Sequence, residues 1–363
     1  MSARRWLQGL LLAVVGWLAG AAQAEPYLAI RYGLKCAACH VNPTGGGLRN
    51  AVGNAFAQGS IPANALPEAL QGWTGGFFGD RLRVGGDWRS AQTDTRVSGQ
   101  PTQRATGTEQ GRLYADVQVL ADYLGVYVDE AVAPGKAERM ESYARLSTPG
   151  MGWYAKLGQF YLPFGWRLQD NTAFVRQVSG ISMTVPDKGV ELGMEQGDWT
   201  AQLVYSRGPG NKGTVTGHQW TGNVAWLQSW GRLGFSTAQV TSTGGSRQAY
   251  GFYGGTTTGP VAWLGEVDLV SDSGFPEGRR RLMSGLLEAN WLVRQGHNLK
   301  ISSEYFDPDR SVSNDQKMRY SLVYEYTPIA FLQLRGGVRH YDGIPQNKFD
   351  NRRQTFVELH GLF

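Results

Sequence analysis

The sequence predicts an all-β fold, a 16-stranded antiparallel β-barrel of the outer-membrane kind, preceded by a short N-terminal segment. Three observations lead to this prediction. From about residue 81 onward apolar and polar residues alternate with a period of two, the alternating stretches count to sixteen, and short and long connections alternate between them. One apolar and one charged face are typical of a membrane barrel with a wet interior. A soluble β-sandwich also alternates, but it has no reason to gather its short connections at one end.

The alternation is clearest in residues 112–122 and 261–269. Leu113 and Val117 fall on one face of the first stretch, and Val261 and Trp263 fall on one face of the second. Because successive side chains of a strand point to opposite faces, the intervening acids should face the interior. There they would hydrate the lumen or hold cations. The interior acids expected on this basis are Asp116, Asp122, Glu266 and Asp268.

The connections give the barrel its orientation. Those after the even-numbered strands are nearly absent, as at Tyr123-Leu124, whereas the one between Pro163 and Gly189 is long. Outer-membrane barrels have short periplasmic turns and longer external loops. We therefore expect both termini in the periplasm and the long loops outside the cell.

The composition agrees with such a barrel. The chain has 50 Gly in 363 residues, and aromatic residues make up 12% of it. Frequent Gly indicates many turns, and aromatic residues form girdles at the two membrane interfaces. The net charge of +5 comes from scattered residues with no polybasic tail, so nucleic acid is not an expected partner.

Residues 1–24 read as a secretory signal peptide. Arg4 and Arg5 precede an apolar stretch, and Ala22-Gln23-Ala24 is a typical cleavage site, so the mature chain should begin at Glu25. The alternative is an uncleaved anchor, but the apolar stretch is short for a membrane-spanning helix.

The only two cysteines lie in the sequence Cys36-Ala37-Ala38-Cys39-His40. In an exported protein a cysteine pair can form a disulfide. However, C-x-x-C-H is the attachment signature of c-type haem. Two thiols bond to the vinyl groups of the porphyrin, and the following imidazole binds the iron. We expect one covalent haem c, with Cys36 and Cys39 as attachments and His40 as the axial iron ligand.

The residues after this motif offer further haem contacts. Gly45-Gly46-Gly47 would let the backbone approach a flat cofactor, and Arg49 either pairs with a haem propionate or is a solvated surface charge. Tyr27, Tyr32 and Phe56 are candidates to pack on the ring. No His or Met occurs from Val41 through Arg139, so the sixth iron ligand lies farther along the chain, is an amine, or is absent.

The domain organisation follows from these features. Residues 25–75 are too few to bury a haem unaided, so this cytochrome c-like segment should lean on the barrel as a lumen plug. Residues 76–363 should form the porin-like barrel in the outer membrane, with the N-terminus in the periplasm.

Two stretches carry a family resemblance. Leu157-Gly158-Gln159-Phe160-Tyr161-Leu162-Pro163-Phe164-Gly165, and Asp187 to Leu192 running on to Ser206-Arg207-Gly208, are similar to the phosphate- and anion-selective porins. The order of signal peptide, CxxCH and sixteen strands resembles the fused monohaem cytochrome–porins of the outer-membrane iron-oxidising type. That resemblance implies electron transfer at the cell surface, including oxidation of iron(II).

The expected function is therefore an electron conduit. Its partners would be a periplasmic cytochrome or other electron carrier, an extracellular metal or redox donor or acceptor, and outer-membrane lipid. No catalytic triad or phosphate loop accompanies the haem motif, so no catalytic residue is assigned to this possible iron(II)-oxidising protein. The alternatives are an anion-selective porin and a barrel with a non-conducting redox or haem-sensor plug.

Overall fold

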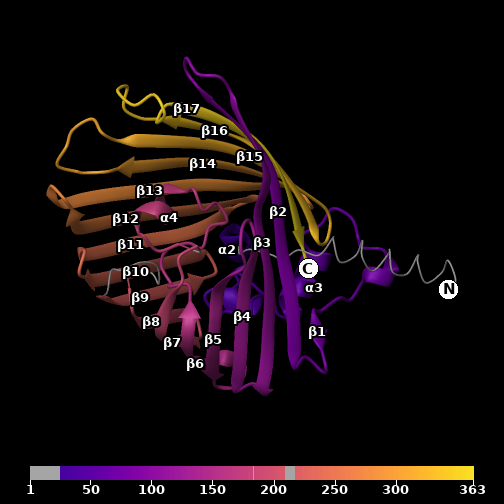
Figure 1. Cartoon of the computed structure of the whole chain (residues 1–363). Helices are drawn as coiled ribbons and strands as arrows, with labels where there is room; N and C mark the ends of the chain where they lie inside the picture. The colour runs from indigo at the N-terminus through magenta and orange to yellow at the C-terminus, as the bar shows by residue number, and fades with distance from the viewer. Residues whose placement is uncertain (1–24, 183, 209–216) are drawn as a thin grey trace.

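The computed structural model describes residues 25–363 except Met183 and residues 209–216, so the predicted signal peptide lies outside the described part. One antiparallel sheet closes on itself around a lumen (Figure 1). The last wall strand pairs with the first, with Leu362 opposite Asp87 and Arg352 opposite Val97.

The wall has sixteen strands, as predicted. In chain order they are β2 (Leu82–Val97), β3 (Gln103–Leu120), β4 (Leu124–Ala133), β5 (Glu138–Ser147), β6 (Trp153–Phe160), β7 (Asp187–Gln196), β8 (Trp199–Ser206), β9 (Gly217–Gln228), β10 (Gly231–Ser242), β11 (Gly245–Thr258), β12 (Val261–Phe275), β13 (Gly278–Arg294), β14 (His297–Asp307), β15 (Lys317–Ile329), β16 (Leu332–Asp342) and β17 (Arg352–Leu362). The two-residue β1 (Gly76–Phe77) pairs with β2 below the wall.

The first hairpin is longer than its sequence pattern predicts. β2 and β3 stay paired up to Thr95 and Gln103, although the alternation that predicts the second strand is clear only in residues 112–122. Residues 92–108 are polar on both faces, so they show no apolar alternation. Arg104 and Asp94 form an ion pair at 2.8 Å across this extension. Backbone pairing continues there beyond the apolar band, which is why periodicity alone missed it.

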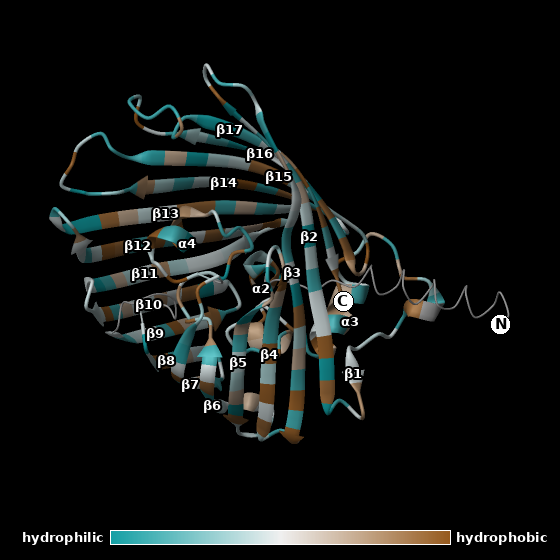
Figure 2. Ribbon diagram, viewed as in Figure 1, coloured by the Kyte–Doolittle hydropathy of each residue, from teal (hydrophilic) through white to brown (hydrophobic). Residues whose placement is uncertain are grey.

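The outer face of the barrel is apolar. Leu157, Leu192 and Val357 are among its most exposed side chains. Brown and teal residues alternate along the strands in Figure 2, as expected when one face meets lipid and the other the lumen. Trp226 lies 5.9 Å from Trp199 and 6.1 Å from Trp230 between ring centroids, so an aromatic cluster marks the end with the short turns.

No helix in the described part of the chain is long and apolar enough to cross a membrane.

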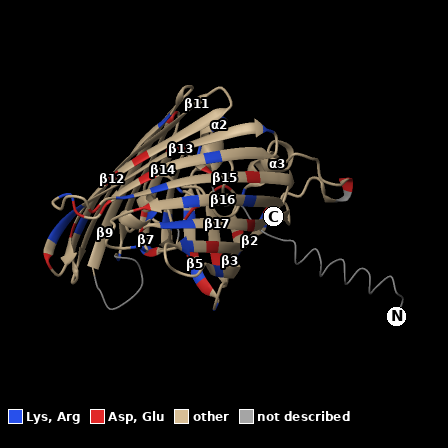
Figure 3. Cartoon of the chain, turned by 90° about the horizontal axis from the view of Figure 1, so that it is seen from above, with Lys and Arg blue, Asp and Glu red and all other residues tan. Residues whose placement is uncertain are grey.

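Charged residues of both signs are distributed along the strands (Figure 3), and buried ion pairs such as Arg112–Asp129 at 2.8 Å lie on the inner face. Asp116, Glu266 and Asp268 point inward and are buried, as expected from the alternation. Asp122 does not: it is exposed in the turn between Leu120 and Leu124, with φ +64°. β3 ends before it, so the period of two no longer applies. Among the described residues no group of three His, Cys, Asp or Glu side chains could hold a metal ion.

The long connection after β6 turns into the barrel instead of lying outside, contrary to our expectation for the long loops. This inner loop, residues 161–186, contains α4 (Phe174–Val178). Its backbone donates to inward-facing wall carboxylates, from Trp166 N to Glu266 at 2.9 Å and from Phe174 N to Glu304 at 2.7 Å. Its apolar side chains explain the inward course, since Tyr161, Leu162, Phe164, Trp166 and Val175 are all buried.

The N-terminal segment, residues 25–75, is short helices and turns. These are α2 (Pro26–Arg31), η1 (Cys36–Ala38), α3 (Ala51–Gly59) and η2 (Glu68–Leu70). Helix α2 contacts β11 and β12. Arg31 donates to Pro260 O and Lys35 to Trp199 O, both at 2.8 Å, and both acceptors lie at short turns. The segment therefore lies at the short-turn end of the barrel.

Arg335 provides a test of the inner ion pairs. It bridges Glu325 at 3.3 Å and Glu358 at 2.9 Å, and all three side chains are buried. We expect Arg335→Leu to lower the free energy of unfolding by about 3–5 kcal/mol, because it leaves the buried Glu358 without its cation and Glu325 with Lys300 alone. Urea unfolding followed by heat-modifiable gel migration measures this.

The matched control is Leu334→Met, on the lipid face of the same strand. It conserves volume and should change the free energy of unfolding by less than about 1.5 kcal/mol. Equal losses for the two variants would contradict the assignment of inner and outer faces.

Candidate functional site

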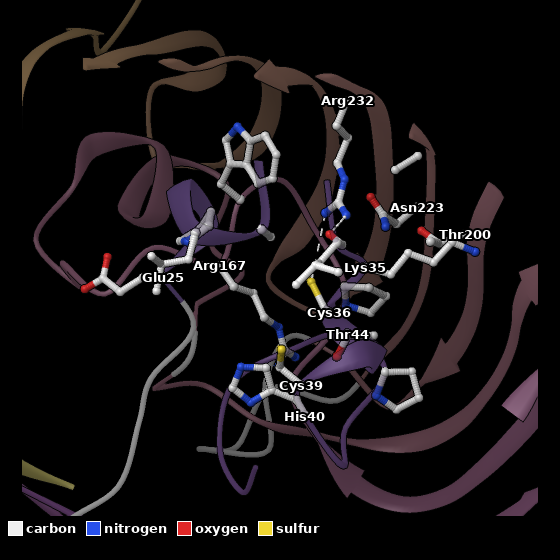
Figure 4. A pocket seen from close by; sticks show the side chains of 18 of the residues that line it. Glu25, Lys35, Cys36, Cys39, His40, Thr44, Arg167, Thr200, Asn223 and Arg232 are labelled. Carbon is white, nitrogen blue, oxygen red and sulfur yellow. Dashed lines mark hydrogen bonds between the residues drawn. The ribbon is translucent and has the colours of Figure 1, made fainter. Parts of the chain in front are cut away.

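The Cys36–His40 stretch folds into a single tight turn. The His40 and Cys39 amides donate to Cys36 O at 3.0 and 3.2 Å. This turn brings Cys36, Cys39 and His40 to the same cavity, as Figure 4 shows. Both cysteines are free thiols and half-buried, so they form no disulfide here.

A glycine-rich turn follows the motif. Val41 N donates to Leu48 O at 3.0 Å, and His40 and Arg49 form an isolated β-bridge across the turn. Gly45, Gly46 and Gly47 all have positive φ, between 62° and 88°. A Cβ on Gly47 would lie 2.3 Å from the Tyr127 hydroxyl of β4. The glycines thus serve a left-handed turn pressed against the wall. They do not line the cavity, contrary to the close approach to a cofactor that we expected.

Helix α3 packs against the backbone of the Cys36–His40 turn. The Asn50 side chain caps the helix by accepting from Gly53 N at 2.9 Å, and it donates to Ala37 O and Ala38 O at 3.1 and 3.2 Å. A Cβ on Gly53 would lie 2.1 Å from Cys39 O. Only glycine allows this approach, so the helix fixes the backbone that carries both thiols.

The cavity has about 1090 Å³ of space, including the part open to solvent. Three parts of the chain form it: the N-terminal segment, the inner loop and the wall. Its apolar lining includes Leu28, Ala29, Phe56, Phe164 and Trp166. Its cationic lining consists of Lys35, Arg49, Arg167 and Arg232, whereas Glu25 is its one carboxylate among the described residues. The cavity is therefore an apolar, electropositive site.

His40 is suited to bind a metal. Its side chain is buried, and its Nδ1 has no hydrogen-bond partner. Burial, followed by the nearby charge of Arg49, lowers the pKa of His40 to about 3. The imidazole is therefore neutral at ordinary pH, which is the form that ligates iron.

Arg49 also reaches the cavity, so it is not a solvated surface charge. Its Nη1 is buried without a hydrogen-bond partner. Burial lowers the pKa of Arg49 to about 10, so the guanidinium stays charged at neutral pH. An unpaired buried cation of this kind suits a carboxylate ligand. The structure thus brings all four sequence-predicted site residues together.

Of the three aromatic residues expected to pack on the haem, two lie at or next to the cavity and one does not. Phe56 lines the cavity, and Tyr32 packs edge-on against it at 4.8 Å between ring centroids. Tyr27 points away, because its hydroxyl donates to Glu325 of the wall at 3.3 Å. No His other than His40, and no Met, lines the cavity in the described part of the chain. A second His or Met ligand is therefore not in place.

Sequence reasoning missed Arg167, Trp166 and Arg232. Arg167 donates to Gly45 O, and the Trp166 ring lies 5.0 Å from that of Tyr253. Arg232 has an inward position near the start of β10, which the alternation could have found. Arg232 contacts Cys36 only because the barrel closes, and closure cannot be predicted from a local sequence pattern.

One buried cluster, here called the Asn42 cluster, holds the glycine-rich turn against the wall. Asn42 is fully buried; it accepts from Lys156 Nζ at 2.8 Å and donates to Glu141 at 3.3 Å. Lys156 also pairs with Glu191 at 2.8 Å, and Arg145 donates to Val41 O at 2.7 Å. Charged side chains of the wall here bond to the N-terminal segment, so this segment lies against the inner face of the barrel at their level.

Solved structures with a similar fold are outer-membrane porins. The anion-selective porin of Comamonas acidovorans is 13% identical, with a TM-score of 0.60 over 78% of this chain and 100% of that one. OmpT of Vibrio cholerae in its trimer form is 10% identical, with a TM-score of 0.60 over the same shares. The channel DcaP of Acinetobacter baumannii is 11% identical, with a TM-score of 0.57 over 79% of this chain and 99% of that one.

No family model matches the chain, and no curated protein matches its sequence. Sequence identities this low support a similar fold and nothing further. The closed sixteen-strand wall, the lipid-facing apolar band and these neighbours agree with one another. The chain is an outer-membrane β-barrel with the porin fold.

Proposed function

We propose that this protein transfers electrons across the outer membrane through one c-type haem attached at Cys36 and Cys39. Its electron donor would be extracellular, iron(II) being the one implied by the family resemblance, and its acceptor a periplasmic electron carrier. The reverse direction would use the same partners in exchanged roles.

The observation that carries the proposal is the shared cavity of two free thiols and a buried neutral imidazole. Cys36, Cys39 and His40 open into one apolar space, and the Nδ1 of His40 lacks a partner. These residues fit a covalently attached haem: thiols at CxxC spacing, an imidazole to bind iron, and buried cations for carboxylates. When bound, such a haem supplies a one-electron Fe(III)/Fe(II) couple.

The residues of the chain would then have separate roles. Cys36 and Cys39 would anchor the porphyrin by thioether bonds, and His40 would bind the iron. Arg49 holds a propionate. The apolar side chains of Phe56, Phe164 and Trp166 exclude water.

The contacts that the N-terminal segment and the inner loop make with the inner face of the wall support transfer of electrons in preference to ions. The Asn42 cluster seals one wall to the N-terminal segment, and the inner loop binds the wall from the other side through Glu266 and Glu304. An electron can pass packed protein that blocks a hydrated ion.

A second candidate is an anion-selective porin with a non-conducting redox or haem-sensor plug. One fold neighbour is described as an anion-selective porin. The absence of a second His or Met among the described cavity residues would leave an iron position open to a small ligand. Ion conductance and spectral shifts in carbon monoxide separate this candidate from an electron conduit.

The haem itself is tested by staining. Outer membranes from cells with a cytochrome c maturation system should give a haem-stained band near the mature mass on a denaturing gel. Cys36→Ala/Cys39→Ala should lose the stain while the barrel still inserts, because only thioether bonds survive denaturation. An unstained wild-type band would contradict the proposal.

The seal is tested by single-channel recording in planar bilayers. The full chain should conduct at least several-fold less than an open sixteen-strand porin. Asn42→Leu should raise the conductance, because it removes one hydrogen bond each from the buried Lys156 and Glu141 and so weakens the contact between the wall and the N-terminal segment.

The matched control is Asn64→Leu. Asn64 is exposed and donates to Pro328 O at 3.0 Å outside the cavity, so its loss should leave the conductance low. A wild-type chain that conducts like an open porin would favour the second candidate.

A further inference from the structure

Arg232 brings a buried positive charge to the first thioether position. It comes from β10 and is 5% exposed. Its Nη2 donates to Leu34 O at 2.8 Å, and its Nη1 lies 4.0 Å from Cys36 Sγ. In Figure 4 the guanidinium points from the wall toward Cys36. The barrel thus supplies a positive charge in contact with this thiol.

No carboxylate neutralises Arg232 directly. Within the described residues it makes no ion pair, and its Nε is buried without a hydrogen-bond partner. The nearby Glu195 is paired with Lys35 at 3.5 Å, and Glu25 is paired with Lys300 at 3.2 Å. The charge of Arg232 is therefore free to act on whatever the cavity holds.

Two other arginines add to this charge. Arg49 and Arg167 line the same cavity, and neither makes an ion pair in the part of the chain described. The guanidinium of Arg167 donates hydrogen bonds to the carbonyl oxygens of Gly45 and Tyr161. Three guanidinium groups thus surround the thiols, more than two propionates would neutralise.

Buried charge changes the balance between the two oxidation states of a redox centre. The oxidised form of a one-electron couple carries one more positive charge than the reduced form. A fixed cation in a low-dielectric surrounding therefore disfavours the oxidised form and raises the reduction potential. Because Arg232 has little access to water, solvent screens its charge weakly.

We propose that the arginines of this cavity, Arg232 foremost, raise the reduction potential of the bound haem and so favour its acceptance of electrons. This inference rests on the proposed function and deepens it, because it names the residues of this chain that set the reduction potential of the haem. Arg232 acts here as a tuning residue through its charge, without ligating iron.

The test is a redox titration of the full haem-bearing chain in detergent, followed by its visible spectrum. Arg232→Gln should shift the ratio of oxidised to reduced haem by about tenfold at a fixed ambient potential, which is a fall of about 59 mV for a one-electron couple. Arg232→Lys keeps the charge and should stay near the wild-type potential.

Arg279→Gln is the matched control for loss of a charge. Arg279 is exposed near the loop end of β13, so the potential should not move. Should Arg232→Gln fail to reach the outer membrane, Arg49→Gln carries the same test and should also lower the potential.

The outcomes separate the two proposals. Equal shifts for Arg232→Gln and Arg232→Lys would overturn the tuning role, because geometry and not charge would be responsible. An unshifted potential in Arg232→Gln would overturn it as well. A wild-type chain without covalent haem would overturn the proposed function, and this inference with it.

Discussion

The hydrogen bonds of Asn42 are the contact on which the site depends. Asn42 accepts from Lys156 on β6 and donates to Glu141 on β5, and Glu141 in turn accepts from Tyr161 N at the start of the inner loop. One buried side chain therefore joins the N-terminal segment, the wall and the loop. Lys156 and Glu141 are buried, and each would lose a hydrogen bond in a structure that lacks this contact, which costs free energy. The glycine-rich turn, and the cysteine motif before it, are positioned as a consequence.

The cavity is formed jointly by the N-terminal segment, the wall and the inner loop. A segment of residues 25–75 has too little apolar surface to enclose a large cofactor, but the wall and the inner loop supply Trp166, Arg167 and Arg232. The barrel thus contributes both the walls and much of the charge of the site. Assembly of the cavity should follow closure of the barrel, since Arg232 and Trp166 reach it from strands and loops far apart in sequence.

The sequence was sufficient for the barrel wall because alternation is a local signal. All sixteen strands were predicted, and so were the inward positions of Asp116, Glu266 and Asp268. The errors arose where that signal ends. Asp122 lies past the end of β3, the β2–β3 extension is polar on both faces, and the long loop after β6 folds inward to bury its apolar residues. The cavity motif was also local, whereas Arg232 and the Asn42 cluster depend on contacts between distant segments.

The proposed function requires that electrons, and not ions, cross this barrel. The most direct measurement uses sealed liposomes that carry the full haem-bearing protein in one orientation and enclose an oxidised, membrane-impermeant electron acceptor. Iron(II) is added outside, and the absorbance of haem and acceptor is followed. The account predicts that the haem is reduced first and the enclosed acceptor afterwards, with no reduction in liposomes that carry the Cys36→Ala/Cys39→Ala protein. An enclosed acceptor that stays oxidised while the haem is present would contradict it.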